Sequence, residues 1–135
     1  MIKKFVYILL LFCDSCTRYT LTSPDGEQTL TLRTAPLSYT LSNKGEKVML
    51  DASPTMTINQ SVWGEETPLS VEYCAPYQGA VTPLYGKQDT LQESYNQLIV
   101  HYESYDFVIR LYNEGLAYRF VGTGAQEDTL TIFSE

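Results

Sequence analysis

Residues 105–121 read YDFVIRLYNEGLAYRFV, and this stretch decides the fold class of the chain. Apolar side chains alternate with their neighbours on either side of an Asn-Glu-Gly corner, as Phe107, Ile109 and Leu111 do before it, which is the pattern of two β-strands. The corner suits a short hairpin loop in which Gly115 takes a positive φ. Because both faces of both strands carry apolar residues, we expect the hairpin to lie inside a sheet that is covered on each side.

The same alternation predicts further strands along the chain. They are expected at residues 18–22, 28–34, 37–42, 47–50, 55–63, 70–74, 91–103 and from 129 onward. The sequences SPDG at 23–26 and NKGE at 43–46 are strong turn signals, and residues 75–79 interrupt the pattern and are expected to form a loop. No helix start, apolar stripe and stop signal coincide after residue 16. The predicted fold class is therefore all-β, an antiparallel β-sandwich.

The first sixteen residues are expected to be a signal peptide rather than part of the fold. A basic start with Lys3 and Lys4 is followed by an apolar core at residues 5–12 and then by small or polar residues. Eight apolar residues are too few for a transmembrane span, which needs about 20. The sequence thus predicts a signal peptide at 1–16, a β-sandwich domain at 17–135, and export to the periplasm or cell surface.

The roles open to the three cysteines depend on where the signal peptide is cleaved. Cys13 and Cys16 have the C-x-x-C spacing of redox and zinc sites, but no second Cys or His pair exists to complete a metal site. Their place at the end of the apolar segment favours the signal peptide. Ser15-Cys16 also offers a lipoprotein cleavage point, so a lipid anchor at Cys16 is the alternative to simple cleavage. Cys74 would then be alone, and no disulfide is expected.

Composition excludes one class of partner. The chain has 16 acidic and 9 basic residues, a formal charge of −7, whereas binding to a nucleic acid needs a basic stripe against the phosphate backbone. We therefore expect no nucleic-acid partner. The 11 tyrosines and 5 phenylalanines favour β-structure.

The hairpin also resembles one known family. Its segment RLYNEGLAYRF, residues 110–120, is similar to R-x-[YF]-[ND]-[DE]-G-[LV]-[AG]-[FY]-R-[YF] in the N-terminal domain of family 97 glycoside hydrolases, which are α-glucosidases and α-galactosidases found mainly in Bacteroides-like bacteria. Residues 21–26 (LTSPDG), 83–86 (PLYG) and 95–98 (YNQL) resemble that family's L-x-S-P-D-G, P-x-[WY]-G and Y-N-E-L segments in the same order. The matching motif positions are Gly86, Tyr95, Asn96, Arg110, Asn113, Gly115 and Arg119.

The resemblance implies a galactose-mutarotase-like super-sandwich, of which this chain would be about the first half and therefore incomplete. In the family, catalytic carboxylates lie in a later (β/α)₈ barrel, and calcium is held by glutamates mostly from that barrel and one from later in the N-terminal domain. We accordingly assign this chain no catalytic, cofactor-binding or metal residue, and calcium is expected only in the full-length family. An α-linked oligosaccharide would be bound through the catalytic domain.

The motif residues are expected to be structural. Arg110 and Arg119 flank the hairpin and should pair with carboxylates or carbonyls at the sandwich surface or at a domain interface. Gln97 departs from the family, which usually has Glu there. If that carboxylate pairs with an arginine, the amide keeps the hydrogen bond and loses the charge.

Few other residues suggest chemistry. His101 is expected to be a half-buried strand residue rather than a catalytic base, because no nucleophile motif accompanies it. The adjacent acids Glu65 and Glu66 are expected to be solvated charges in a loop rather than a glycosidase pair. Trp63, Tyr77 and Tyr85 could stack on sugars, or their rings could fill the seam between two sheets or an interface with another domain.

Two functions follow. The first is the non-catalytic N-terminal β-sandwich region of an exported α-glycoside hydrolase, which packs against a catalytic barrel and helps to shape its cleft. The second is a stand-alone carbohydrate-binding or cell-surface β-sandwich without hydrolase activity. In either case the chain is not expected to hydrolyse a glycoside alone.

Overall fold

The computed structural model describes residues 17–82, 84, 86, 90–124 and 132–134. The expected signal peptide, Cys16 and Tyr85 lie outside these residues. The described chain forms antiparallel strands and no helix, which confirms the all-β class. The strands are β1 (Arg18–Thr22), β2 (Gln28–Thr34), β3 (Leu37–Asn43), β4 (Glu46–Ala52), β5 (Met56–Ile58), β6 (Ser61–Trp63), β7 (Ser70–Tyr73), β8 (Tyr77–Val81), β9 (Leu91–His101), β10 (Tyr105–Tyr112), β11 (Leu116–Gly122) and β12 (Ile132–Ser134).

The first sheet is a meander in the order β1-β2-β3-β4. Its inner residues are the ones that alternation predicts, among them Leu30 and Leu32 of β2 and Leu37 of β3, all buried. The β3–β4 hairpin turns through Lys44 (φ 50°) and Gly45 (φ 83°). Two consecutive positive φ values are the requirement of the type I′ turn, whose twist matches that of the strands it joins.

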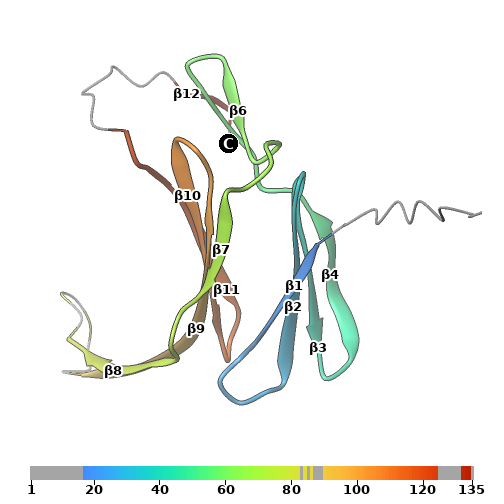
Figure 1. Ribbon diagram of the computed structural model, residues 1–135. Helices are drawn as coiled ribbons and strands as arrows, with labels where there is room; N and C mark the ends of the chain where they lie inside the picture. The colour runs from blue at the N-terminus through green and yellow to red at the C-terminus, as the bar shows by residue number, and fades with distance from the viewer. Residues whose placement is uncertain (1–16, 83, 85, 87–89, 125–131, 135) are drawn as a thin grey trace, which may run out of the picture.

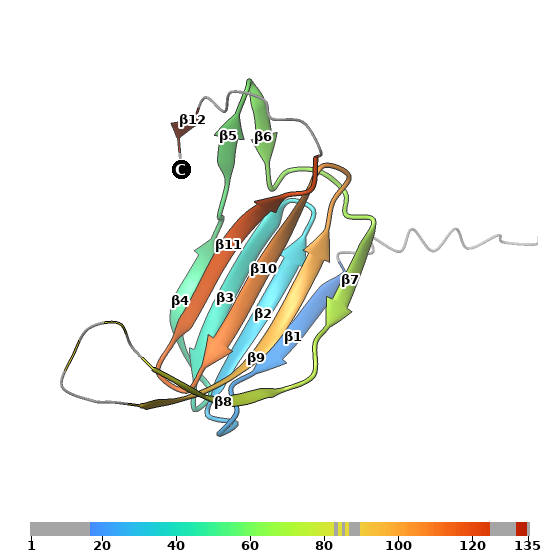
Figure 2. The same cartoon turned by 90° about the vertical axis from the view of Figure 1, so that its left-hand side faces the viewer.

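The second sheet has the order β11-β10-β9-β7, and β8 pairs with the beginning of β9. The hairpin of residues 105–121 supplies two of these strands, with Phe107 opposite Phe120 on β11 and opposite Val100 on β9. The two sheets face each other as layers (Figure 1), and their strands run in nearly the same direction (Figure 2). This is the aligned packing of a β-sandwich.

The core lies between the two layers. Its fully buried side chains come from both sheets, and each contributes about 1.5–3 kcal/mol relative to an exposed position. They are Leu30, Leu32, Leu37, Leu98, Val100, Tyr105, Phe107, Ile109 and Leu111. The inward face of β10 is therefore the centre of the core, as its sequence predicts.

A small third sheet in the order β12-β5-β6 lies at one end of the sandwich (Figure 1). Residues 55–63 are expected to form one strand, and this expectation is wrong. Asn59 (φ 47°) and Gln60 (φ 68°) both adopt left-handed conformations and reverse the chain between β5 and β6. Asparagine tolerates this region better than most residues, but glutamine gives no such signal.

Two other expectations are corrected. Residues 75–79 are not entirely a loop, because β8 begins at Tyr77 and pairs with β9 from Tyr95 back to Leu91. Strand β9 extends well beyond β7, and β8 satisfies the backbone groups that would otherwise be unpaired. Gly115 does not adopt a positive φ. The corner turns instead with Tyr112 N–H donating to the Gly115 carbonyl at 2.7 Å.

The hairpin is also covered on one face only by the described residues. On its outer face, Val108 is buried, but Ala117, Arg119 and Val121 of β11 are exposed. Apolar residues on this second face are therefore not evidence of a second covering layer within the described chain. Exposed Ala117 and Val121 on the strand at the end of the sheet suffice to produce the pattern.

Candidate functional site

Three of the segments that resemble the family meet at one end of the sandwich. Asn113 at the β10–β11 corner bonds to Asp25 in the SPDG turn, and Asn96 on β9 bonds to Thr22 directly before that turn. We call residues 22–28, Asn96 and Asn113 the motif junction. The contacting residues are 74 and 88 positions apart in the sequence, so the junction joins distant parts of the chain.

The turn of the motif junction is held by its own side chains. The Ser23 hydroxyl donates to the Asp25 carboxylate at 2.6 Å and accepts from the Gln28 N–H at 2.9 Å. The Asp25 carboxylate also accepts from the Glu27 N–H at 3.0 Å. These bonds, the one from Ser23 first, lower the pKa of Asp25 below its ordinary value. The turn is thus stabilised by bonds within residues 23–28 as well as by its contacts with the second sheet.

Two asparagines then connect the sheets. The Asn113 side-chain oxygen accepts from the Asp25 N–H at 3.0 Å, and the Asn113 backbone carbonyl accepts from the Gln28 side-chain amide at 2.6 Å. Asn96 donates its side-chain N–H to the Thr22 carbonyl at 2.6 Å. All these partners are backbone groups or amides. The motif junction is therefore a structural connection and contains no arrangement for acid–base chemistry.

Arg110 lies on the outer face of the second sheet, in a second cluster. Its Nε donates to the Gln97 side-chain oxygen at 2.7 Å, and its guanidinium lies 4.4 Å from the centre of the Tyr95 ring. The Gln97 amide in turn donates to Cys74 Sγ at 3.4 Å. The condition stated for Gln97 is met in this structure, because the residue at this position bonds to an arginine. The amide oxygen bonds the arginine, while its N–H₂ gives a bond that a glutamate could not make.

Tyrosines extend this cluster. Tyr77 stacks on Tyr95 with ring centres 4.8 Å apart, and Tyr112 packs on Tyr95 at 5.2 Å. The Tyr112 hydroxyl donates to Glu93 at 3.0 Å. Tyr77, one of the three candidate sugar contacts, remains 39% exposed. A partly exposed ring on an aromatic support is a geometry that can stack on a sugar, and the role of Tyr77 stays a prediction.

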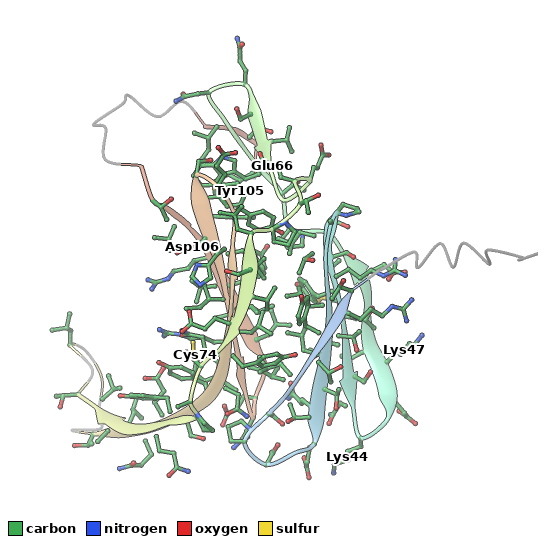
Figure 3. All side chains as sticks on the ribbon, viewed as in Figure 1. Lys44, Lys47, Glu66, Cys74, Tyr105 and Asp106 are labelled. Atoms are coloured by element: carbon green, nitrogen blue, oxygen red, sulfur yellow. The ribbon has the colours of Figure 1, made fainter. Side chains whose placement is uncertain are left out.

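Trp63 occupies a different place. Its indole stacks on the Tyr105 ring, with ring centres 4.3 Å apart and an interplanar angle of 8°, and packs on Phe120 at 6.1 Å. The Tyr105 hydroxyl accepts from the Gly64 N–H at 2.8 Å, which fixes the neighbouring backbone. Figure 3 shows Tyr105 at the end of the sandwich nearest the small sheet. This packing supports the alternative in which the Trp63 ring fills a seam, and its sugar contact stays a prediction.

Two further motif positions are Gly86 and Arg119. Gly86 has φ 132°, so glycine is required there. Arg119 is exposed and makes no hydrogen bond or ion pair with any described residue, so its expected pairing at a domain interface stays a prediction. It lies on β11, the last strand in the order of its sheet among the described residues.

A further polar cluster was not predicted. His101 on β9 lies 2.8 Å through Nδ1 from Asp106 and 3.0 Å through Nε2 from Glu72. The hydrogen bond with Glu72, and next that with Asp106, raises the pKa of His101 above its ordinary value. His101 is half-buried in its strand, as expected. The β9–β10 register places Asp106 opposite His101. Register depends on both strands and cannot be predicted from the sequence of one, so the sequence analysis does not predict this cluster.

Within the described residues, no three His, Cys, Asp or Glu side chains are placed to hold a metal ion. The described part of the chain contains no helix that is long and apolar enough to cross a membrane.

The fold and these clusters define a class of protein. It is an antiparallel β-sandwich module whose distinctive residues connect strands and sheets to one another. Residues 21–135 match the family described as Glycosyl-hydrolase 97 N-terminal, and the chain belongs to this family. The resemblance stated from the four sequence segments is thereby confirmed.

Relatives cover this chain but extend far beyond it. It is 30% identical over 132 residues to a retaining alpha-galactosidase of Bacteroides thetaiotaomicron, a match that covers 90% of this chain and 20% of the galactosidase. A glycoside hydrolase family 97 enzyme from Pseudoalteromonas sp. strain K8, solved with panose and with acarbose, aligns with a TM-score of 0.69 at 17% identity. That alignment covers 84% of this chain and 19% of the enzyme, and it shows the shared fold. The chain thus spans about a fifth of the length of these relatives.

Proposed function

We propose that this chain is the non-catalytic N-terminal β-sandwich region of an exported α-glycoside hydrolase of the α-glucosidase or α-galactosidase type. In that role it packs against a catalytic barrel and helps to shape the substrate cleft. The observation that carries the proposal is the family match over residues 21–135, within which the motif segments form a structural junction. The relatives matched are glycosidases, and one was solved with the oligosaccharide panose.

Several large apolar side chains are exposed in the described part of the chain. Leu84 is 93% exposed, Leu69 72% and Val48 64%, and Tyr118 and Val121 remain exposed on β11. They lie on different elements, and single exposed apolar side chains are normal on a protein surface, so they do not carry the proposal. Among the described residues, strand β11 ends the order of its sheet, and such an edge can pair with a further strand.

Hydrolysis tests the proposal directly. The full chain is incubated with nitrophenyl α-glucoside and nitrophenyl α-galactoside, with and without added calcium. No release of nitrophenol above background is expected, because the described residues contain no cluster that could hold a metal ion and no catalytic pair is assigned. Turnover by the chain alone would overturn the non-catalytic role.

The genome gives the complementary test. The DNA directly downstream of the codon for residue 135 should resume the sandwich and then encode a barrel. An unrelated neighbouring gene after a well-defined stop would contradict the proposal and favour the stand-alone sugar-binding protein. The exposed Tyr77 ring on Tyr95 is the observation that favours this second function. Calorimetry with panose would detect it, and Tyr77→Ala should then abolish the binding.

Export is part of the proposal. A leader that ends at residue 16 would place the domain in the periplasm or at the cell surface, and acylation of Cys16 would anchor it to a membrane. Mass spectrometry of the protein purified from its host distinguishes these cases. Simple cleavage gives an unmodified mature N-terminus, acylation adds the mass of a lipid to Cys16, and an intact Met1 would contradict export.

A further inference from the structure

The outer face of the first sheet, which lies away from the core, is hollowed. The hollow has a volume of about 270 Å³. We call it the basic trough, and it is lined by Arg18, Thr31, Arg33, Ser38, Tyr39, Thr40, Ser42, Lys47 and Asp51. Figure 3 shows Lys47 on the side of this sheet that faces away from the second sheet. No motif position and no family-resembling segment contributes a residue to the lining.

Strand register builds the trough from polar rows. In one row Arg33 lies opposite both Arg18 and Ser38, and in the next Thr31 lies opposite Thr40. A third row runs through Ser42, which lies opposite Lys47 on β4. Side chains in such rows stand on the same face of the sheet, so hydroxyl and cationic groups face one common space.

Irregular pairing gives the trough its depth. The register between β3 and β4 shifts twice, between Tyr39 and Leu41 and again between Leu41 and Ser42. Asp51 on β4 has φ 45°. Bulges of this kind bend a strand and increase its twist, so the β4 edge curves relative to the flat part of the sheet. A sheet face without them would offer no hollow.

The charges of the trough are unbalanced. It contains three cations, Arg18, Arg33 and Lys47, and one carboxylate, Asp51, in a chain whose net charge is −7. None of the three cations forms an ion pair with any described residue. Arg18 and Arg33 are direct cross-strand partners, and like charges in this position destabilise a sheet. An anion bound between them would remove that repulsion.

We infer that the basic trough is a binding site for a saccharide that carries a carboxylate or sulfate group. Two neighbouring guanidinium groups can bind one oxyanion through paired, charge-assisted hydrogen bonds. The hydroxyls of Thr31, Thr40 and Ser42 can both donate to and accept from sugar hydroxyls. The volume is just below the roughly 300–1,000 Å³ of typical ligand pockets, which suits one sugar residue. The inference rests on the residues of the trough and not on the proposed function.

Calorimetric or NMR titration of the full chain tests the site. The probes are glucuronate, glucose 6-sulfate, glucose and inorganic sulfate. Both charged sugars should bind with millimolar affinity, at least tenfold more tightly than glucose or inorganic sulfate. Raising NaCl from 0.05 to 0.5 M should weaken that binding several-fold, because the site is exposed to screening. Absence of binding by the charged sugars, or equal binding by glucose, overturns the inference; equal binding by inorganic sulfate overturns its saccharide part.

Matched arginine variants locate the binding. Arg33→Gln should reduce affinity for glucuronate at least tenfold, whereas Arg119→Gln, at an equally unpaired arginine on β11, should leave it unchanged. Because Arg33 faces Arg18, Arg33→Gln should keep or raise the melting temperature, so a loss of binding would not reflect unfolding. Unchanged affinity in Arg33→Gln, or an equal loss in Arg119→Gln, would refute the location.

Discussion

The side-chain oxygen of Asn113 accepts a hydrogen bond from the backbone N–H of Asp25 at 3.0 Å, across 88 residues of sequence. Asn113 lies at the corner of the hairpin that forms the core, and Asp25 lies in the turn of the opposite sheet. The bond joins the two most recognisable segments of the chain. Motif residues that would suggest a ligand site in isolation thus have a structural purpose, which is to fix one sheet relative to the other.

The first prediction concerns that bond. Asn113→Ala should lower the free energy of unfolding by about 0.5–1.5 kcal/mol, because a hydrogen bond of this kind contributes roughly that amount. Glu114→Ala, at the next and equally exposed position, is the matched control and should change stability by less than about 0.5 kcal/mol. Urea unfolding followed by circular dichroism measures both. Equal stability of the two variants would show that the junction contributes nothing.

The second prediction separates two glycines at hairpin corners. Gly45→Ala should cost about 1–2 kcal/mol, because Gly45 has φ 83° and a Cβ is strained there. Gly115→Ala should cost less than about 0.5 kcal/mol, since Gly115 has no positive φ and an added Cβ would meet nothing within 4 Å. Melting temperatures of the two variants test this contrast. A larger loss of stability in Gly115→Ala than in Gly45→Ala would indicate that Gly115 adopts the positive φ expected from the sequence.

Alternation in the sequence predicts the strands whose two faces differ most. Leu30, Leu32, Phe107 and Ile109 point inward as expected, because a single buried face imposes a period of two. The β5–β6 hairpin was missed, because Gln60 gives no sign of the left-handed conformation that it adopts. Local sequence predicts a turn poorly when tertiary packing forces it.

The clusters on the sheet faces were harder to predict than the strands. Gln97 was expected to replace a carboxylate beside an arginine, and the structure places it against Arg110. The His101 cluster and the basic trough depend instead on which strands are neighbours and in what register. That information is spread over the whole chain, so no single segment contains it.

The third prediction concerns Gln97. Gln97→Glu should convert the hydrogen bond with Arg110 into an ion pair that stabilises by about 0.2–1 kcal/mol in low salt and disappears in 1 M NaCl. Gln97→Leu should be less stable than the wild type at every salt concentration, because Arg110 loses its acceptor. Urea is the appropriate denaturant, because guanidinium chloride is itself a salt and would screen the ion pair. A gain in stability for Gln97→Glu that persists in 1 M NaCl would exclude the ion pair.

The fourth prediction uses Trp63, the single tryptophan of the chain. Trp63→Ala should cost about 3 kcal/mol, because it removes a large ring stacked on Tyr105 and packed on Phe120. Tyr77→Ala, which removes a ring on the outer face, should cost clearly less. Urea unfolding by circular dichroism compares them. Equal losses of stability in the two variants would show that the Trp63 ring contributes no more to the packing than the ring of Tyr77 on the outer face.

The last prediction follows from the position of His101 between Glu72 and Asp106. Its pKa is raised by these two hydrogen bonds, so the folded state binds the proton more tightly than the unfolded chain does. The stabilisation is fully present below the ordinary histidine pKa of about 6.5 and is lost as the pH rises through the higher folded-state value. The His101 cluster should therefore stabilise the folded protein at pH 5.5 and not at pH 9.

His101→Gln removes the titrating group and isolates its effect, since the chain has one histidine. The difference in unfolding free energy between wild type and variant should be about 0.5–1 kcal/mol larger at pH 5.5 than at pH 9, the range of a partly exposed ion pair. Carboxylates titrate in both proteins and cancel in this difference. An NMR titration of the imidazole should give a pKa above about 6.5. A pKa at or below that value, or a difference that does not change with pH, would show that the two carboxylates do not hold the proton.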